Sequence, residues 1–465
     1  MRPVVTVAEM RAADAESPVA VDVLIERAGR AVANEALRLL GGGYGRRVAV
    51  VCGPGNNGAD GRAAAAYLAA RGAAVEVIEP GVGPERIHGA DLVIDGAFGT
   101  GLRSPYRAPD VGKTPVLSVD IATGVDGDTG VAAEGSVEAV GTVTMAALKP
   151  GLLLADGPGR CGGVVVADIG LPVGAPMAHL VEDADLGWLP HRGRNAHKWA
   201  AAVWIVAGSA GMRGAPLLCS RAAQRAGAGM VRLGTPGLSA AEHPAGEAVA
   251  VGLPELGWEK TVDGDLERFG ALVIGPGLGR SEALGASVRA LVGSPVVGKA
   301  TIPTVVDADG LYALGCPDRL RDDRDAPMVL TPHDGEFARL VGHPPGADRM
   351  AEVRALAATT GATVLLKGPT TVVADPSGRV LLCNSGDARL ATAGTGDVLA
   401  GIVGAFLAAG LAGLEAAALA AHVHGRAARM GSPVGLVAGD IPDLIPSVLA
   451  GPSVLAEASV LAGPG

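Results

Sequence analysis

Short runs of Val and Ile alternate along the chain with longer Ala-rich stretches of helical composition. The expected strands are nearly continuous in apolar residues and cover 47–52, 74–79, 92–96, 116–121, 202–208, 271–275, 304–309, 328–331 and 363–368. The expected helices between them include 59–72, 215–229 and 350–361. Apolar strands followed by helices are typical of parallel sheets with both faces covered. The pattern therefore predicts an α/β fold class built from doubly wound sheets.

The alternation of strands and helices breaks at the polar segment LGWLPHRGRNAHK, residues 186–198. A chain of 465 residues is long enough for two domains. We therefore expect an N-terminal domain over 1–188 and a C-terminal domain over 189–450. The remaining residues, 451–465, are few and low in complexity, and we expect a mobile tail there.

Composition narrows the possible partners and location. The chain has 48 acidic and 38 basic residues, a net charge of −10 that argues against a nucleic-acid partner. Its 5 cysteines are dispersed with no CxxC spacing, which favours a reduced, cytoplasmic location over a disulfide framework. The uncharged stretch 398–414 is short and rich in Ala and Gly, so it indicates a buried helix, and no membrane contact is expected.

A first glycine-rich loop, GPGNNGADG at 53–61, directly follows an expected strand and opens a helix. It contains the GxGxxG pattern of dinucleotide-binding folds, so a nicotinamide-dependent dehydrogenase is one interpretation. However, Asn56, Asn57 and Asp60 add polar side chains that can bind an alkali metal or ribose hydroxyls. A plain strand-to-helix turn with Asp60 near the N-cap is the purely structural alternative.

Two further loops, DGAFGTGL (95–102) and SVDIATGVDGDTG (118–130), also follow expected strands. The carboxyl ends of parallel strands share one edge of a sheet, so all three loops are predicted to converge on one crevice. Asp95, Asp120 and Asp126 are then candidate ligands or acid/base groups. The motif KPG at 149–151 adds a possible cation.

Taken in order, these four motifs resemble those of the NAD(P)HX epimerase family over most of residues 1–185. The resemblance implies a Rossmann-like domain that interconverts the R and S forms of hydrated NADH or NADPH. It implies a potassium ion held by Asn57, Asp95 and Thr123. The implied substrate contacts are Asn56, Asn57, Gly58, Ala59, Asp60, Gly99, Thr100, Gly101, Leu102, Arg103, Ser104, Pro105 and Asp120. The sequence departs from the family pattern at Ala59, usually Gly, and at Ala122-Thr123, usually Pro-Ser.

Inverting a hydroxyl-bearing carbon beside a nitrogen requires proton delivery and an iminium-like intermediate. We expect Asp120 to be the acid/base group, with Lys149 as an electrostatic helper. A surface lysine at a strand end is the alternative interpretation of Lys149.

The later half contains GPGLG (275–279), DADGL (307–311), LTPHDGEF (330–337), LLKGPTTVV (365–373) and ATAGTGDVLAG (391–401). A GTGD sequence that opens a helix presents backbone N–H groups and the helix dipole to an anion. Asp397 then lies where it can take a proton from an attacking hydroxyl. The structural alternative for Asp397 is an ordinary acid in the first turn of a helix.

These motifs resemble the ribokinase-like superfamily, specifically its ADP-dependent NAD(P)HX dehydratase branch, over about 195–445. The implied nucleotide contacts are Lys367, Gly368, Pro369, Thr370, Thr371, Ala393, Gly394, Thr395 and Gly396. The implied hydrate contacts are Ala215, Gly277, His333 and Asp397, and Glu336 would organise a magnesium ion. The implied reaction phosphorylates the hydrate's C6 hydroxyl with Asp397 as base, then eliminates phosphate, converting ADP to AMP. Asp334 stands where the family usually has Pro.

The leading hypothesis is a two-domain metabolite-repair enzyme, an epimerase followed by a dehydratase, whose partners are NADHX or NADPHX and ADP. We also expect a homo-oligomer. One alternative is a ribokinase-like kinase of small-molecule hydroxyls with a nucleotide-binding N-terminal domain. Another alternative treats the N-terminal half as a catalytically silent binding module.

Overall fold

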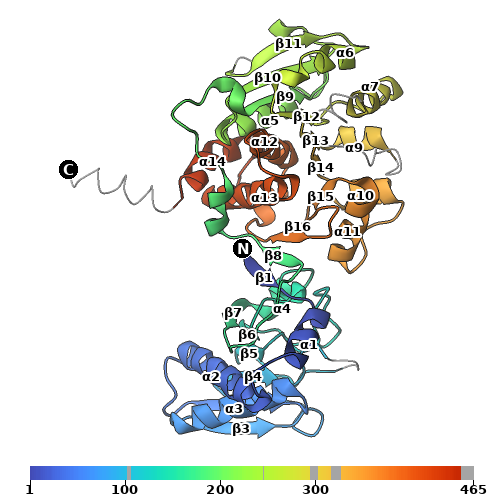
Figure 1. Cartoon of the computed structure of the whole chain (residues 1–465). Helices are drawn as coiled ribbons and strands as arrows, with labels where there is room; N and C mark the ends of the chain where they lie inside the picture. Colours follow the sequence, from blue (N-terminus) through green and yellow to red (C-terminus); the bar gives the residue numbers. More distant parts are fainter. Residues whose placement is uncertain (102–105, 244–245, 294–301, 316–325, 452–465) are drawn as a thin grey trace, which may run out of the picture. The chain divides into compact units, whose positions relative to one another are not determined.

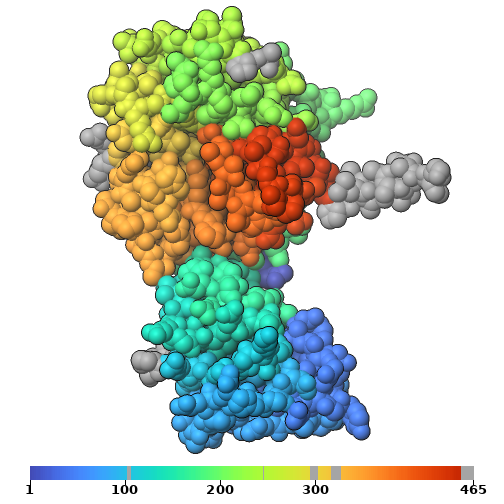
Figure 2. Space-filling view, turned by 180° about the vertical axis from the view of Figure 1, so that it is seen from behind, coloured from blue at the N-terminus to red at the C-terminus, as the bar shows by residue number. Residues whose placement is uncertain are grey.

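The computed structural model describes residues 1–101, 106–243, 246–293, 302–315 and 326–451 (Figure 1). Two compact units make up the chain, an N-terminal unit over Arg2–Ala178 and a C-terminal unit that starts at His179. Figure 2 distinguishes them by colour, with the N-terminal unit in blue to teal and the C-terminal unit in green to red. Of the predicted tail, 451–465, residues 452–465 lie outside the described residues.

The N-terminal unit is a parallel sheet with helices packed on it. Its elements are β1 (Arg2–Val4), α1 (Val7–Ala15), α2 (Val21–Leu40), β2 (Arg47–Cys52), α3 (Asn56–Ala70), β3 (Ala74–Ile78), β4 (Leu92–Gly96), β5 (Val116–Val119), β6 (Gly141–Met145), η1 (Pro150–Leu152), α4 (Gly157–Cys161) and β7 (Gly163–Ala167). The six-stranded sheet has the order β3-β2-β4-β5-β6-β7, with parallel pairing throughout.

Helices α2 and α3 pack closely against each other and against this sheet (Figure 1). At Gly29 a Cβ atom would lie 2.4 Å from the Cβ of Ala63, so the approach of the two helices requires glycine there. Their apolar faces and the strands form one buried cluster that includes Val32, Leu68 and Ile94. This core fixes the start of α3, and with it the first glycine-rich loop, at the carboxyl edge of the sheet.

The C-terminal unit is a larger sheet with helices on both faces. Its strands are β8 (Ala178–Leu180), β9 (Ala202–Val206), β10 (Met230–Pro236), β11 (Val249–Leu253), β12 (Ala271–Ile274), β13 (Thr304–Val306), β14 (Met328–Leu330), β15 (Thr363–Leu366), β16 (Thr371–Ala374) and β17 (Val380–Cys383). Its α-helices are α5 (Gly214–Arg225), α6 (Trp258–Asp263), α7 (Glu282–Val292), α9 (Asp309–Leu314), α10 (Asp334–Val341), α11 (Arg349–Thr360), α12 (Thr395–Ala408), α13 (Gly413–Met430) and α14 (Ile441–Leu449). Short 3-10 turns are η2 (Asp183–Trp188), η3 (Lys198–Ala201), η4 (Ala240–Glu242), η5 (Leu266–Arg268), η7 (Ala388–Leu390) and η8 (Ala438–Asp440).

From β8 the strands run in the order β8-β17-β16-β15-β14-β13-β12-β9-β10-β11. Strands β9 to β15 pair in parallel, whereas β16 pairs antiparallel with both β15 and β17. Helices α12 and α13 lie on one side of the sheet and α9, α10 and α11 on the other (Figure 1). The doubly wound α/β prediction is confirmed.

The expected strands all form, and several end one to three residues earlier than predicted. The residues that leave the sheet early include Asp120, Asp307 and Lys367, which instead turn into the loops at its carboxyl edge. The hairpin of β16 and β17 was not predicted, because the expected pattern alternates strands with helices.

Residues 179–188 lie between the structural division and the predicted domain boundary. Trp188 packs against the core of the C-terminal unit. A carboxylate oxygen of Asp183 lies 2.8 Å from the Nε2 of His422, and Asp183 also forms an ion pair with Arg426 at 3.0 Å. Both partners are on α13. These contacts assign the segment to the C-terminal unit.

The uncharged stretch 398–414 forms most of α12 and the start of α13. Every residue of α12 from Val398 to Ala408 is buried in the C-terminal core. In the part of the chain that the structure describes, no helix has the length and hydropathy to cross a membrane.

Candidate active sites

In the N-terminal unit, Asp95 is the last residue but one of β4 and a buried carboxylate, 3% exposed. It accepts hydrogen bonds from the backbone N–H of Thr123 at 2.9 Å, the hydroxyl of Thr123 at 2.7 Å and the hydroxyl of Ser118 at 3.0 Å. Burial raises the pKa of Asp95, and these donors lower it in part. The structure thus brings together two of the three predicted potassium ligands.

Asn57, the third predicted ligand, is the second residue of α3. Its Nδ2 donates to the carbonyl of Val119 at 2.7 Å, which leaves its Oδ1 as the acceptor. A Cβ atom at Gly99 would lie 2.7 Å from this Oδ1, so the loop after β4 passes directly over the Asn57 side chain.

Glycine is required in the first loop where two backbones meet. A Cβ atom at Gly53 would lie 1.7 Å from the carbonyl oxygen of Ala97, and one at Gly58 would lie 1.8 Å from that of Gly53. Ala59, by contrast, is within α3 and its N–H donates to Gly55 at 3.1 Å. Because a helical position suits alanine, the departure at Ala59 leaves the loop intact.

Asp120 directly follows β5 in a left-handed backbone conformation, with φ of 68°. Such a conformation is uncommon for a residue other than glycine and often occurs at functional sites. The ammonium of Lys149 donates to its Oδ1, and also to the hydroxyl of Thr144 at 2.8 Å. Lys149 is only 1% exposed, so the surface-lysine interpretation is wrong.

A cavity of about 120 Å³ opens beside this pair. Its lining includes Asp14 from α1, Asn56 and Asp60 from α3, and Asp120 with Lys149. Burial and the neighbouring Asp120 and Asp14 raise the pKa of Asp60 to about 7, although Lys149 opposes this. Asp14 was missed by the sequence analysis, since it lies in an ordinary-looking helix far from the glycine-rich loops.

The remaining residues predicted for this site lie in the loops after β4 and β5. Asp126 accepts from the N–H and hydroxyl of Thr129, both at 2.8 Å, so it organises its own turn. Thr100 lies against the next loop, because a Cβ atom at Gly127 would lie 2.7 Å from its Cγ2. The predicted contacts Leu102, Arg103, Ser104 and Pro105 lie outside the described residues.

In the C-terminal unit, the GTGD sequence begins α12, as predicted. Gly394 is the N-cap with φ of 90°, a conformation that favours glycine. Thr395 fixes the turn by donating its hydroxyl toward the carbonyl of Leu390 at 2.8 Å. Ala393 and Gly396 flank this cap, so the first N–H groups of the helix form a potential anion site.

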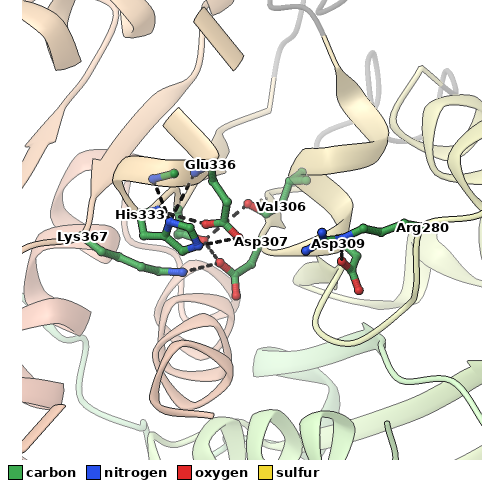
Figure 3. A network of polar contacts seen from close by, with 9 residues as sticks. Arg280, Val306, Asp307, Asp309, His333, Glu336 and Lys367 are labelled. Carbon is green, nitrogen blue, oxygen red and sulfur yellow. Dashed lines mark hydrogen bonds and ion pairs between the residues drawn. The ribbon is translucent and has the colours of Figure 1, made fainter. Parts of the chain in front are cut away.

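An ion pair between a partly exposed lysine and a buried aspartate lies next to this helix start (Figure 3). Asp307, 1% exposed, accepts from the ammonium of Lys367 at 2.6 Å and from the hydroxyl of Thr331 at 2.6 Å. A Cβ atom at Gly396 would lie 3.3 Å from the Lys367 ammonium. Burial alone would lower the pKa of Lys367, but Asp307, Glu336 and Asp397 outweigh it and raise the value.

Asp397, the third residue of α12, is half-buried and faces this cluster. Burial and the nearby Asp307 raise its pKa to about 6, with Lys367 acting in the opposite direction. A carboxyl group with a pKa slightly below neutrality is suited to general-base catalysis.

His333 caps α10. Its Nδ1 accepts from the N–H groups of Gly335 at 3.0 Å and Glu336 at 3.2 Å, so in the neutral ring the proton is on Nε2. Glu336 returns the contact, because its Oε2 accepts from the N–H of His333 at 3.0 Å (Figure 3). Among the described residues, no cluster of three or more His, Cys, Asp or Glu side chains could hold a metal ion by itself.

The two remaining predicted hydrate contacts meet each other. A Cβ atom at Gly277 would lie 3.0 Å from that of Ala215 on α5. The loop that contains Gly277 is held by Asp309, the first residue of α9, which accepts from the N–H of Gly279 at 2.9 Å and from Arg280 at 2.8 Å (Figure 3). The sequence analysis did not predict Asp307 and Asp309 as site residues. The DADG motif could have indicated them, because it directly follows an expected strand.

The predicted nucleotide loop runs from Lys367 through Gly368, Pro369 and Thr370 to Thr371, which begins β16. Arg349 anchors it by donating to the carbonyl of Lys367 at 3.2 Å. The same guanidinium makes a two-pronged ion pair with Asp334, at 2.7 and 3.0 Å. Asp334, the departure from the family's usual Pro, therefore holds two loops of the site together.

Comparisons with known proteins identify the family of the chain. A family model described as NAD(P)H-hydrate dehydratase matches residues 203–443, and one described as YjeF-related protein N-terminus matches 21–86 and 82–151. The bifunctional NAD(P)H-hydrate repair enzyme of Mycobacterium leprae is 38% identical over 95% of this chain and 96% of its own.

Solved structures resemble part of the chain. A ribokinase-like superfamily protein from Enterococcus faecalis V583 has a TM-score of 0.50 and 21% identity, covering 59% of this chain and 95% of its own, which shows the fold. An ADP/ATP-dependent NAD(P)H-hydrate dehydratase from Bacillus subtilis, co-crystallized with ATP/Mg²⁺, is 31% identical with a TM-score of 0.49, over 58% of this chain and 96% of its own. The chain belongs to the family of bifunctional NAD(P)H-hydrate repair enzymes.

Proposed function

We propose that the C-terminal unit uses ADP to dehydrate the S form of hydrated NADH or NADPH, and that the N-terminal unit interconverts the R and S forms. The observation that carries the first half is the ion pair of Lys367 and Asp307 beside Asp397, at the open start of α12. The combination of the two activities in one chain also makes chemical sense. A dehydratase that accepts only one epimer needs an epimerase to convert the other epimer into its substrate.

In the first step, Asp397 takes the proton of the hydrate's C6 hydroxyl, and the oxygen attacks the terminal phosphorus of ADP. The new O–P bond forms as the bond to the bridging oxygen breaks, and AMP leaves. The N–H groups at the start of α12 stabilise the negative charge on the transferred phosphoryl group. Lys367 adds a fixed positive charge, held in place by Asp307.

In the second step, the C6–O bond breaks and phosphate leaves, with the ring nitrogen supplying electrons to form an iminium. Loss of a proton from C5 then restores the dihydronicotinamide ring. Phosphate is a far better leaving group than hydroxide, which explains why a kinase-like scaffold suits a dehydration.

Glu336 is proposed to help hold a magnesium ion that accompanies the nucleotide. Its Oε2 is used by the helix cap, whereas its Oε1 lies 3.6 Å from the Nε2 of His333, a contact longer than a normal hydrogen bond. One available carboxylate oxygen fits this ion, which usually takes one or two protein carboxylates and otherwise binds phosphates and water. Bound there, magnesium would neutralise phosphate charge.

In the N-terminal unit, the oxygen-rich set around Asp95 fits a potassium ion. Its carboxylate is buried, and no ion pair found among residues 2–101 and 106–178 involves it, so a cation would offset its charge. Asn57 and Thr123 supply neutral oxygens, which suit hard cations. Bound there, potassium would fix the loops that surround the hydrate, while Asp120 exchanges protons with it.

The test supplies mixed epimers with ADP, with ATP or with no nucleotide, and follows dihydronicotinamide absorbance and AMP. The expected result is recovery of both epimers with ADP and release of AMP. Asp397→Asn should abolish recovery and leave epimer exchange intact, whereas Asp120→Asn should abolish epimer exchange and leave recovery of the S form intact. Recovery of only one epimer would contradict the epimerase half, and no recovery with either nucleotide would favour the kinase alternative.

A further inference from the structure

We propose that Asp60 is a second proton-transfer group of the epimerase and works with Asp120 on opposite faces of the hydrated ring. This inference rests on the proposed epimerase activity of the N-terminal unit. It goes beyond a contact with the substrate, because it gives Asp60 a chemical role in each turnover.

Asp60 is a buried carboxylate that lacks the usual partners. It is 6% exposed and lines the cavity that Asp120 and Lys149 also line. Among residues 1–101 and 106–178, no donor lies within hydrogen-bond distance of it, whereas Asp95, equally buried, accepts four hydrogen bonds. Its oxygens are not sealed inside the protein but open into the cavity, where a bound ligand can contact them.

A structural role for Asp60 does not explain this arrangement. The N-cap of α3 is Gly55, which makes Asp60 the fifth residue of the helix, beyond the first turn where an acid caps N–H groups. The glycine-rich turn is instead fixed by Asn57 and by Arg62, whose guanidinium donates to the carbonyl of Gly53 at 3.0 Å. The side chain of Asp60 is therefore free to serve the cavity.

The chemistry needs two groups because the hydroxyl leaves from one face of the ring and returns to the other. An acid protonates the departing hydroxyl as the C6–O bond breaks, and the ring nitrogen's electron pair forms an iminium. A base then removes a proton from water as its oxygen bonds to C6 on the opposite face. The net change is one proton passed from acid to base, so the two groups exchange roles in the reverse direction.

The surroundings divide these roles between the two carboxyl groups. Asp120 receives the ammonium of Lys149 and the hydroxyl of Thr144, at 3.1 Å for the latter, which suits a carboxylate base. Asp60 faces Asp14 and Asp120, and its pKa of about 7 keeps a substantial fraction protonated near neutrality. Two carboxyl groups at one cavity, one held by a lysine ammonium and the other without a hydrogen-bond donor, are typical of acid–base pairs.

Asp14 acts through Asp60 as a positioning residue. It lies on α1 at the same cavity, and burial together with Asp120 raises its own pKa. Its negative charge is one of the causes that raise the pKa of Asp60. Replacing Asp14 with Asn should therefore move the pH profile of epimer exchange to lower pH without abolishing the exchange.

The test measures epimer exchange without nucleotide, starting from enriched R or S hydrate, in the full-length chain. Asp60→Asn should lower kcat by roughly 100-fold or more, the usual contribution of an acid–base group, with little change in KM. Asp60→Glu, which keeps the carboxyl group, should retain at least tenfold more activity than Asp60→Asn. Asp22→Asn, an exposed acid on α2, is the matched control and should exchange at the wild-type rate.

Each outcome is decisive. If wild-type protein exchanges epimers and Asp60→Asn matches it, the inference is overturned while the epimerase function stands. If Asp60→Asn and Asp60→Glu lose activity equally and both raise KM, Asp60 is structural and the inference is also overturned. If the wild-type chain shows no exchange at all, the proposed function itself fails. ADP-dependent recovery of S hydrate should be unchanged in every variant.

Discussion

Replacing Asp397 with Asn should abolish dehydration and, at neutral pH, stabilise the C-terminal unit. In the folded protein, burial and Asp307 raise the pKa of this carboxyl from 3.8 to about 6. Between these two values the folded state binds more protons than the unfolded state, so stability falls as pH rises through that window. Above it, the ionised Asp397 costs stability in full, and Asn removes the cost.

The magnitude follows from the pKa difference. At about 1.4 kcal/mol for each pH unit, a rise from 3.8 to about 6 corresponds to roughly 3 kcal/mol as an upper value. The advantage of Asp397→Asn should be largest above pH 6, shrink as pH falls and vanish below 3.8, where Asp397 is protonated in both states. The buried, charged base that the reaction needs thus lowers the stability of the C-terminal unit.

Tryptophan fluorescence measures this unit alone, because the chain's 4 tryptophans, at 188, 199, 204 and 258, all lie after residue 178. Thermal unfolding of Asp397→Asn and wild type across a pH series gives the difference directly. Glu255→Gln, an exposed acid in the same unit, is the control and should unfold like the wild type at every pH. A variant that is no more stable above pH 6, or whose advantage is independent of pH, would refute the reasoning.

Three further predictions concern single residues. Lys367→Ala leaves Asp307 buried without its cation and should destabilise the C-terminal unit by about 3–5 kcal/mol, measured by tryptophan-detected unfolding. Adding Asp307→Asn to this variant should recover much of the lost stability. Ala308→Gly should stabilise the same unit by about 1 kcal/mol, because Ala308 has a φ of 50°; an unchanged midpoint would contradict this strain. Ala59→Gly restores the family's usual residue but should lower stability by about 1 kcal/mol, measured by calorimetry, without speeding epimer exchange.

Much of the fold could be predicted because continuous apolar runs mark many of the buried parallel strands, although β6, β7, β10 and β11 were not among the expected strands. The strands containing Val50, Ile94 and Val305 lie where continuous apolar runs predicted them. The hairpin of β16 and β17 was missed, since its pairing depends on a turn and a neighbouring strand rather than on a βα repeat. Strand ends were placed too late for a physical reason: apolar pattern does not show where a residue turns out of the sheet toward a ligand.

The site was predictable where the chain carries glycine-rich motifs, and less so elsewhere. Gly394 and Asp397 could be found from their spacing alone, because a GTGD sequence at a helix start has few other purposes. Asp14 could not, since only the fold brings α1 to the cavity beside Asp60. The pair of Asp307 and Lys367 also required the structure, because 60 residues separate the partners.

The most direct test of the two-activity account uses one sample of R hydrate, free of S hydrate. Full-length protein with ADP should convert all of it to reduced cofactor, releasing one AMP for each molecule recovered. Asp120→Asn should block this conversion yet still convert S hydrate at the wild-type rate. If Asp120→Asn converts R hydrate as fast as the wild type, the two units do not act in sequence and the account is contradicted.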